Sequence, residues 1–428
     1  MNCQTLLDTL AAGTWDERIS QLYCCGEAAL PAHRARIAKA VAGYREFSAA
    51  GPEVTVFSAP GRTELGGNHT DHQHGCVLAA SVNLDLLAVA APNGSDSIRI
   101  LSEGYPLLSV KLDALTPQAE EEGTSAALVR GVAALMTAEG HAVGGFDAYV
   151  CSGVPAGSGL SSSAAYEVLI GVMVNHFFCG GGFDPVRIAQ IGQAAENRFF
   201  GKPCGLMDQM ASAVGGIVAI DFANPASPLV RRVDFDFPAA GHALCIIDSG
   251  ADHADLTDEY AAIPREMCAV AAALGKGVLR EVDEAELERA IPALRETVGD
   301  RAVLRALHFF GENRRAQCES TALEQGDFQE FLRLVRASGR SSALYLQNAS
   351  VAATPRRQAI PVALAVAEEI LGDRGAVRVH GGGFAGTIQA FVPVGVLPQF
   401  VSRMEALLGR GSCHVLSIRP QGGCVLFG

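Results

Sequence analysis

The sequence predicts an α+β fold, in which mixed β-sheets pack against helices. Segments typical of strands and of helices come in runs and do not alternate strictly, which argues against a doubly wound parallel sheet. With 428 residues, 49% of them hydrophobic, the chain can bury a large core and has the length of two domains. No internal repeat is visible in the sequence, so a solenoid or a propeller is not expected.

The first half is expected to begin with helices and to continue with most of the strands. Apolar residues at helical spacing, among them Leu6, Leu10 and Ile19, predict a helical lead-in over residues 1–50. Apolar runs bounded by turn residues predict the strands, and a glycine-rich loop is expected directly after the first strand. We expect strands at 54–57, 76–90, 98–102, 107–112, 146–151, 216–222 and 229–235, and helices at 125–139, 160–178 and 184–200.

The second half mixes the two kinds of element in another order. We expect a strand at 243–248, a long helix after position 252, helices through 283–372, and strands at 376–379, 386–393 and 413–418. A domain boundary is expected near position 235, where the strands of the first half end. The chain is therefore divided into a helical lead-in (1–50), an N-terminal domain (51–235) and a C-terminal domain (236–428).

The composition excludes several classes of protein. Lys and Arg total 33 against 46 Asp and Glu, and no basic run interrupts this net charge of −13, so binding to nucleic acid or to an anionic membrane is not expected. The 12 cysteines include no C-x-x-C pair, which is typical of reduced thiols in the cytoplasm. Neither a secretion signal nor a membrane-spanning helix is expected, because Pro393 and Pro398 interrupt the uncharged stretch at 381–402.

The segment GVPAGSGLSSSAA, at 153–165, is expected to bind phosphate. Its glycines let the backbone approach a ligand closely, and it leads into a predicted helix, whose free N–H groups and dipole favour an anion. Its three consecutive serines, at 161–163, can bind phosphate oxygens or Mg²⁺. An ordinary Gly/Ser turn with a serine cap is the alternative, which the strand-loop-helix order disfavours. Because no G-x-x-x-x-G-K-[ST] pattern is present, this is not a Walker loop.

A second segment, GRTELGGNHTDHQHG at 61–75, concentrates polar side chains in a glycine-flanked stretch. It contains an Arg, two carboxylates, an Asn and three His, a set that is too polar for a core and can recognise several hydroxyl groups at once. The three His also suggest a zinc site as an alternative, since imidazole is a common zinc ligand. No further Cys or His cluster of suitable spacing accompanies them, so hydrogen bonding to a sugar or to solvent is the favoured interpretation.

Two carboxylates, Glu196 and Asp208, stand twelve residues apart in the segment AENRFFGKPCGLMDQM. A helical Glu196 and an Asp208 in a loop or at a helix start can divide two tasks, one on a metal ion and one on an acceptor hydroxyl. Taken alone, such a pair is more often two surface carboxylates.

Four segments together resemble the GHMP kinase family and, within it, the galactokinase branch. GRTELGGNHTDHQHG is similar to the sugar-binding motif of that branch, and VPAGSGLSSSAA is similar to the phosphate loop of the family. VHGGGFAGTIQAF, at 379–391, resembles the C-terminal glycine motif, and GKPCGLMDQ, at 201–209, resembles the segment with the catalytic aspartate. The resemblance covers about 54–428. It implies a two-domain GHMP kinase fold with the active site in the cleft between the domains.

The resemblance also implies roles for individual residues. Asp208 would accept the proton of the anomeric hydroxyl or orient that hydroxyl, Arg62 would be the cation beside it, and Ser163 and Glu196 would hold Mg²⁺. The triphosphate of ATP would lie on Pro155, Gly157, Ser158, Gly159, Leu160, Ser161, Ser162 and Ser163. The sugar would contact Glu64, Asn68, His69, Asp71, Gly205 and Tyr260, while Gly382 and Gly383 would shape the site from the second domain.

Four positions of the sugar motif depart from the pattern of the family. His72 and Gln73 stand where the family usually has Tyr-Asn. Asn68 stands where galactokinases carry Glu, and Glu64 stands where they carry Asn. An amide both donates and accepts hydrogen bonds whereas a carboxylate only accepts, so the preferred sugar can differ. The expected activity is formation of galactose 1-phosphate by a monomer or weak dimer. A kinase for galacturonate, arabinose or N-acetylgalactosamine, and a non-catalytic sensor of galactose and ATP, are the alternatives.

Overall fold

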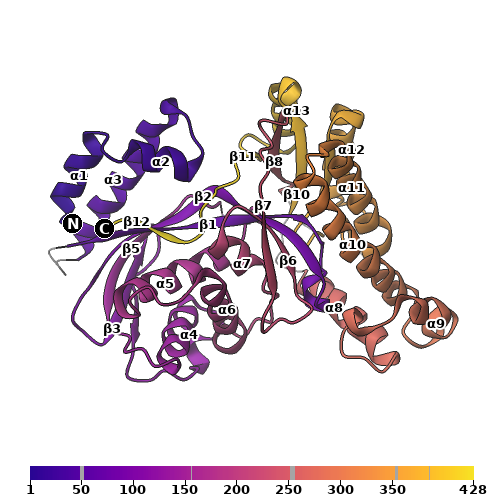
Figure 1. The fold of residues 1–428 in the computed structure, drawn as a ribbon, viewed down its shortest axis with the longest axis horizontal. Helices are drawn as coiled ribbons and strands as arrows, with labels where there is room; N and C mark the ends of the chain where they lie inside the picture. Colours follow the sequence, from indigo (N-terminus) through magenta and orange to yellow (C-terminus); the bar gives the residue numbers. More distant parts are fainter. Residues whose placement is uncertain (49–52, 156, 251–255, 352–354, 385) are drawn as a thin grey trace.

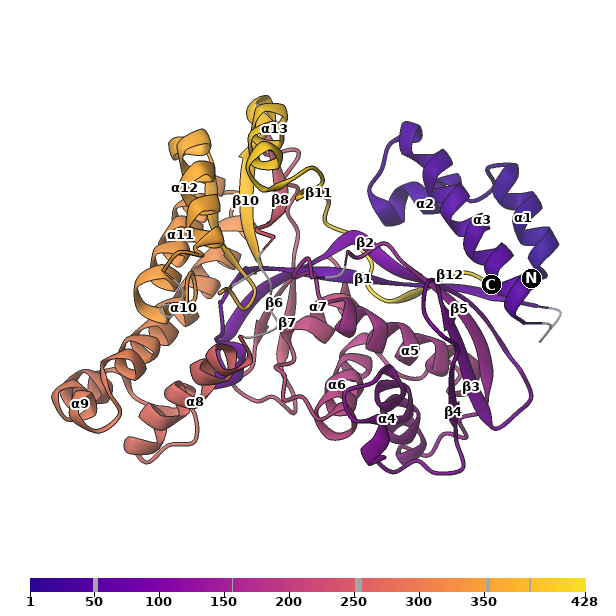
Figure 2. The same ribbon diagram turned by 180° about the vertical axis from the view of Figure 1, so that it is seen from behind.

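The computed structural model describes residues 1–48, 53–155, 157–250, 256–351, 355–384 and 386–428. Across these ranges the chain forms two β-sheets, and helices pack against both of them (Figures 1 and 2). The predicted α+β class is therefore confirmed.

The larger sheet is built from the first half of the chain and from the C-terminal segment. Its strand order is β12-β1-β2-β5-β3-β4, with β6 paired to β2 and β7 to β6, and every pair is antiparallel except β3 with β5. The strands are β1 (Thr55–Gly66), β2 (Cys76–Pro92), β3 (Ser97–Ser102), β4 (Leu108–Lys111), β5 (Phe146–Ser152), β6 (Ile217–Asp221), β7 (Leu229–Val233) and β12 (Cys424–Phe427).

The first strand is longer than the sequence suggested. A loop was expected directly after residue 57, and this is wrong, because β1 continues to Gly66. The long strand β2 provides an antiparallel partner along this whole stretch, with Glu64 opposite Ala79. The register shifts between Pro60 and Arg62, where proline has no N–H for the ladder. Arg62 and Glu64 therefore lie on a strand, which fixes their backbone more firmly than a loop would.

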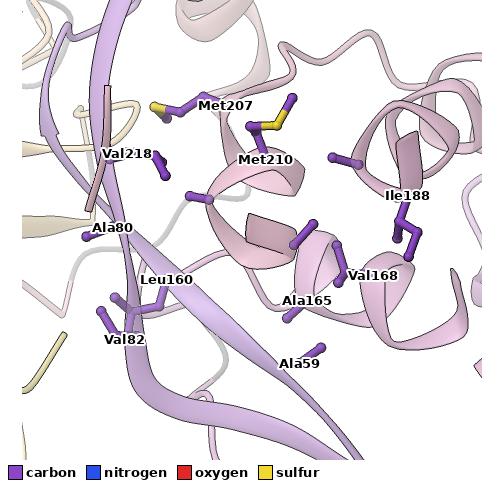
Figure 3. Packing of buried hydrophobic residues seen from close by; sticks show 14 of the residues in the cluster. Ala59, Ala80, Val82, Leu160, Ala165, Val168, Ile188, Met207, Met210 and Val218 are labelled. Carbon is purple, nitrogen blue, oxygen red and sulfur yellow. The ribbon is translucent and has the colours of Figure 1, made fainter. Parts of the chain in front are cut away.

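Helices cover both faces of the larger sheet (Figure 1). The lead-in helices α1 (Cys3–Ala11), α2 (Asp16–Tyr23) and α3 (Leu30–Phe47) share one core with Val56 and Leu87. On the opposite face lie α4 (Ser125–Ala138), α5 (Ser162–Phe178), α6 (Pro185–Ala195) and α7 (Met207–Val214). Figure 3 shows Val168 of α5 and Met210 of α7 within this second core. Burial on both faces explains the long apolar run of β2.

The smaller sheet and most of the remaining helices come from the second half. Its four strands are all antiparallel, in the order β11-β8-β10-β9. They are β8 (His242–Asp248), β9 (Ala376–His380), β10 (Thr387–Pro393) and β11 (Cys413–Leu416). The helices are α8 (Thr257–Ala273), α9 (Glu284–Thr297), α10 (Asp300–Glu324), α11 (Phe328–Ser341), α12 (Ala359–Leu371) and α13 (Leu397–Leu408). The start expected for α8 near position 252 lies outside the described residues.

The end of the chain returns to the larger sheet. Strand β12, which sequence analysis did not find, pairs with β1, so that Phe427 lies opposite Val56. Its residues fall within the stretch assigned to the C-terminal domain by number, yet Cys424, Leu426 and Phe427 pack in the core of the lead-in helices. Among the described residues, no helix is long and apolar enough to cross a membrane.

Candidate active site

The glycine- and serine-rich loop joins β5 to the start of α5. Ser161 precedes the helix with a φ of 55°, a left-handed conformation that is uncommon for serine and is often found at functional sites. Gly159 also has a positive φ, and a Cβ there would lie 2.6 Å from Oγ1 of Thr387 in β10. The loop is therefore pressed against the smaller sheet. The first N–H groups of α5 have no partner within the helix and can bind an anion.

Arg62 connects this loop to β1 and to α7. Its Nε donates to Oδ1 of Asp208 at 2.6 Å, and its Nη2 donates to Oδ2 at 2.7 Å. Its Nη1 donates to the carbonyl oxygen of Gly159. The hydroxyl of Ser161 donates to Oδ2 of Asp208 at 2.7 Å. The structure thus brings the predicted cation, the predicted acidic group and the phosphate loop into direct contact.

Two cavities meet at this cluster. One of about 320 Å³ is lined by the phosphate loop, with Pro155, Gly157, Ser158, Gly159, Leu160, Ser161, Ser162 and Ser163, and by Glu196. The other, of about 770 Å³, is lined by the sugar-motif residues Glu64, His69 and Asp71 together with Gly205, Tyr260 and Gly382. Arg62, Lys202, Cys204 and Asp208 line both. A ligand in one cavity can therefore react with a ligand in the other across Asp208.

The charge of Asp208 is set by its partners. Burial alone would raise the pKa of its carboxyl, but the Arg62 guanidinium and the hydrogen bonds from Arg62 and Ser161 more than offset burial, so the pKa lies below its ordinary value. His380 of β9 lies near Arg62, and burial together with the Arg62 charge holds its pKa well below the usual range. The site thus contains an ionised carboxylate and a neutral imidazole at neutral pH.

Ser163 and Glu196 both line the smaller cavity. Glu196 begins a single π-helical turn (Glu196–Phe200) at the end of α6 and is buried. Its Oε2 accepts a hydrogen bond from Nε2 of Gln209 at 3.0 Å, and its Oε1 lies 3.4 Å from Nζ of Lys202. A hydroxyl and a carboxylate beside a phosphate-sized cavity are the oxygen ligands that Mg²⁺ prefers, so these residues fit that ion.

Several predicted sugar contacts share the larger cavity. The carboxylate of Asp71 rests on Gly205, where a Cβ would lie 1.8 Å from Oδ2 of Asp71. Nε2 of His69 bonds to the carbonyl of Gly382 at 3.2 Å, and since a carbonyl only accepts, this nitrogen carries the proton. Burial lowers the pKa of His69 to about 3, so the ring is neutral. The hydroxyl of Tyr260 donates to the carbonyl of Gly383 at 2.8 Å.

The two exchanged positions of the sugar motif differ in their access to the cavity. Glu64 lines it, whereas Asn68 does not, because Asn68 is completely buried and its side chain bonds to other parts of the protein. Asn68 lines neither of the two cavities, so its direct contact with a sugar, expected from the sequence, stays a prediction. Burial raises the pKa of Glu64 although Arg378 lies beside it.

Further cavity residues were not found from the sequence. Lys202 and Cys204 line both cavities, and Pro264, Arg265 and Cys268 extend the larger one along α8. The spacing of Tyr260, Pro264 and Cys268 by four residues places them on one face of a helix, a pattern that could have identified them. Among the described residues, no cluster of three or more His, Cys, Asp or Glu suited to a metal occurs.

Two family models match the chain. The galactokinase galactose-binding signature matches residues 44–92, which include Arg62, Glu64, Asn68 and Asp71. The model of the N-terminal domain of GHMP kinases matches residues 127–216, which include the phosphate loop and Asp208.

Known proteins are similar to this chain over most of its length. Human galactokinase is 35% identical over 400 residues, which cover 91% of this chain and 96% of the human protein. A crystal structure of Lactococcus lactis galactokinase complexed with galactose superposes with a TM-score of 0.77 at 23% identity, covering 90% of this chain and 98% of that one. A Methanococcus jannaschii mevalonate kinase, at 13% identity, shares the fold with a TM-score of 0.60 over 86% of this chain and 98% of that chain. The chain therefore belongs to the galactokinase branch of the GHMP kinase family and is a galactokinase-like sugar phosphotransferase.

Proposed function

We propose that the protein transfers the γ-phosphoryl group of ATP to the anomeric hydroxyl of galactose, giving ADP and galactose 1-phosphate. The observation that carries this proposal is the shared wall of the two cavities. ATP would place its phosphates in the smaller cavity, the sugar would occupy the larger one, and the Arg62–Asp208 pair lies where the two ligands would meet. Positioning of this kind supplies much of the rate enhancement in phosphoryl transfer.

Asp208 would act on the attacking hydroxyl. Because its pKa is lowered, the group is ionised at neutral pH and is a weak base. It would orient the hydroxyl and accept its proton as the bond from the sugar oxygen to the γ-phosphorus forms and the bond to the leaving ADP oxygen breaks. Arg62 and the N-terminus of α5 would stabilise the negative charge on the transferring group.

Mg²⁺ is the cofactor that the smaller cavity fits. Ser163 and Glu196 would hold it, and the ion would neutralise charge on the phosphates of ATP. Gln209 would keep the carboxylate of Glu196 oriented, since its Nε2 donates to both Glu196 and Glu167. Glu167 is buried, and burial together with the neighbouring Glu196 raises its pKa well above the usual value.

The sugar would be held by the residues that line the larger cavity. Asp71 and Glu64 would accept hydrogen bonds from its hydroxyls, and His69 and Tyr260 would enclose it, while Gly205 leaves room beside Asp71. The size of the cavity favours N-acetylgalactosamine as a second candidate. A volume of about 770 Å³ is in the upper part of the range for small-molecule sites, about 300–1,000 Å³, and leaves space for a substituent along α8.

The experiment is ADP release from MgATP with galactose, N-acetylgalactosamine, galacturonate, arabinose, glucose or no sugar, with the product analysed for phosphate at C1. We expect the largest kcat/KM with galactose. Turnover confined to N-acetylgalactosamine, galacturonate or arabinose would move the protein to a related kinase activity. Binding of sugar and ATP without turnover on any sugar would support a sensor and contradict the proposal. Action as a monomer or weak dimer in the cytoplasm stays a prediction.

A further inference from the structure

Glu64 is held by an arginine from the other half of the molecule. Arg378, on β9, is completely buried, and its Nη2 donates to Oε1 of Glu64 at 2.5 Å and to the backbone oxygen of Glu64 at 2.9 Å. Its Nη1 donates to Oγ of Ser338 at 3.0 Å and lies 3.9 Å from Oε1 of Glu312. Planar guanidinium groups fix a carboxylate in position as well as neutralising it.

Asn68 supports the same carboxylate from behind the cavity wall. Its Nδ2 donates to Oε1 of Glu64 at 3.0 Å and to the carbonyl of Gly381 at 2.7 Å. Its Oδ1 accepts from Nδ2 of Asn348 at 2.9 Å and from Oγ of Ser342 at 3.3 Å. Both ends of the amide are thus committed to protein partners. Of the two exchanged residues, Asn68 is bonded within the protein, whereas Glu64 lines the cavity.

The second carboxylate oxygen of Glu64 is available to a ligand. Among the described residues, Arg378 and Asn68 both bond to Oε1, and no hydrogen bond is formed to Oε2. Oε2 is not among the side-chain atoms that are completely shielded from solvent and unpartnered. Since Glu64 lines the larger cavity, this oxygen meets solvent there. An ionised carboxylate oxygen only accepts hydrogen bonds, so it recognises a hydroxyl or an N–H group.

We propose that Glu64 is a specificity-determining acceptor for one hydroxyl of the sugar other than the reacting one, and that Arg378 is the positioning residue that holds it there. This inference rests on the proposed function, because it assigns a sugar to the larger cavity. The exchange of Glu and Asn in the sugar motif then does not remove the acidic contact. It moves that contact four residues earlier, onto β1, where an arginine from the second sheet can hold it.

The test uses the full chain. Calorimetry without nucleotide measures binding of the sugar, and steady-state kinetics with MgATP measure turnover. The probes are D-galactose and its 2-deoxy, 3-deoxy, 4-deoxy and 6-deoxy derivatives. The variants are Glu64→Gln, Arg378→Lys and the double variant. Glu319→Gln is the matched control, because Glu319 is a buried carboxylate whose charge acts on the same arginine, and it does not line the cavity. Thermal unfolding of each variant verifies that it folds.

Glu64→Gln is expected to weaken D-galactose binding about 10-fold or more, the effect of losing a hydrogen bond to a charged group, with the KM for ATP nearly unchanged. One deoxy sugar should bind to the wild type as weakly as galactose binds to Glu64→Gln. Glu64→Gln should bind that deoxy sugar no more weakly than the wild type does. As a single substitution, Arg378→Lys should weaken sugar binding. Added to Glu64→Gln in the double variant, it should have little further effect. Glu319→Gln should leave sugar binding within about 2-fold.

Three results would overturn the proposal. Unchanged galactose affinity in Glu64→Gln would show that Glu64 makes no contact with the sugar. Additive losses with all four deoxy sugars would show that Glu64 touches none of the non-reacting hydroxyls. An equal effect of Arg378→Lys with and without Glu64 would show that the arginine acts elsewhere. If Arg378→Lys does not fold, the deoxy series on Glu64→Gln still decides about the contact. A wild type that binds none of the sugars would refute the proposed function itself, which is a different result from any of these.

Discussion

Replacement of Asp208 by Asn is the sharpest test of the catalytic assignment. The wild-type carboxylate accepts three hydrogen bonds, two from Arg62 and one from Ser161. An amide of the same shape has one oxygen, so it can satisfy Nε of Arg62 or the pair formed by Nη2 and Ser161, and its NH₂ group would face the remaining donors. The variant also has no carboxylate to orient the attacking hydroxyl or to accept its proton.

The expected loss in kcat for Asp208→Asn is about 10²- to 10⁴-fold, the usual contribution of a positioned general base. The KM for ATP should change little, because the phosphate loop and α5 remain. Because 31% of the Asp208 side chain is exposed, stability should fall by only about 1–2 kcal/mol. Single-turnover kinetics with MgATP and galactose measure the chemical step, and nucleotide titration measures binding. A chemical step within about 10-fold of wild type would refute the role of Asp208.

Three further predictions concern other residues. Gly205→Ala places a methyl group against Asp71 and should raise the KM for galactose about 10- to 100-fold, with the KM for ATP unchanged. Steady-state kinetics measure both constants. Glu196→Gln should raise the Mg²⁺ concentration for half-maximal activity at least about 10-fold, measured by titration at fixed ATP. Glu319 is buried with both carboxylate oxygens unpartnered, and burial raises its pKa well above the usual value. A raised folded pKa means that stability falls as the pH rises above the unfolded pKa, so Glu319→Gln should raise the unfolding temperature at about pH 8 and change it little at about pH 5.

Each of these predictions has an outcome that contradicts it. An unaltered galactose KM in Gly205→Ala would mean that Asp71 is not near the sugar. An unaltered Mg²⁺ requirement in Glu196→Gln would assign the ion to other groups. Equal shifts of the unfolding temperature at both pH values in Glu319→Gln would show that ionisation of Glu319 does not contribute to the pH dependence of stability.

Local patterns carried much of what the sequence predicted correctly. The phosphate loop was recognisable because its glycines and serines and the following helix lie within one short segment, and the structure places that segment between β5 and α5. The lead-in helices were recognisable from apolar spacing. By contrast, β12 is only four residues long and has no periodic pattern, and it forms because β1 offers it an edge from the opposite end of the chain.

The environment of the sugar motif could not be read from local sequence. The pairing of Arg62 with Asp208 joins positions 146 residues apart, and sequence analysis placed the two side by side through the family resemblance alone. The side chain of Asn68 bonds to Asn348, and Glu64 bonds to Arg378, which is 314 residues from Glu64 along the chain. Residue types indicated a polar site, but only the packing of the two sheets decides which polar atom faces the ligand.

A crystal structure of the complex with galactose and a non-hydrolysable ATP analogue tests the central claim most directly. The account predicts phosphates in the loop between β5 and α5, the sugar in the cavity beside Asp71 and Tyr260, and the anomeric hydroxyl within hydrogen-bonding distance of Asp208 and facing the γ-phosphate. A sugar bound elsewhere, or one that presents a different hydroxyl to Asp208, would contradict it.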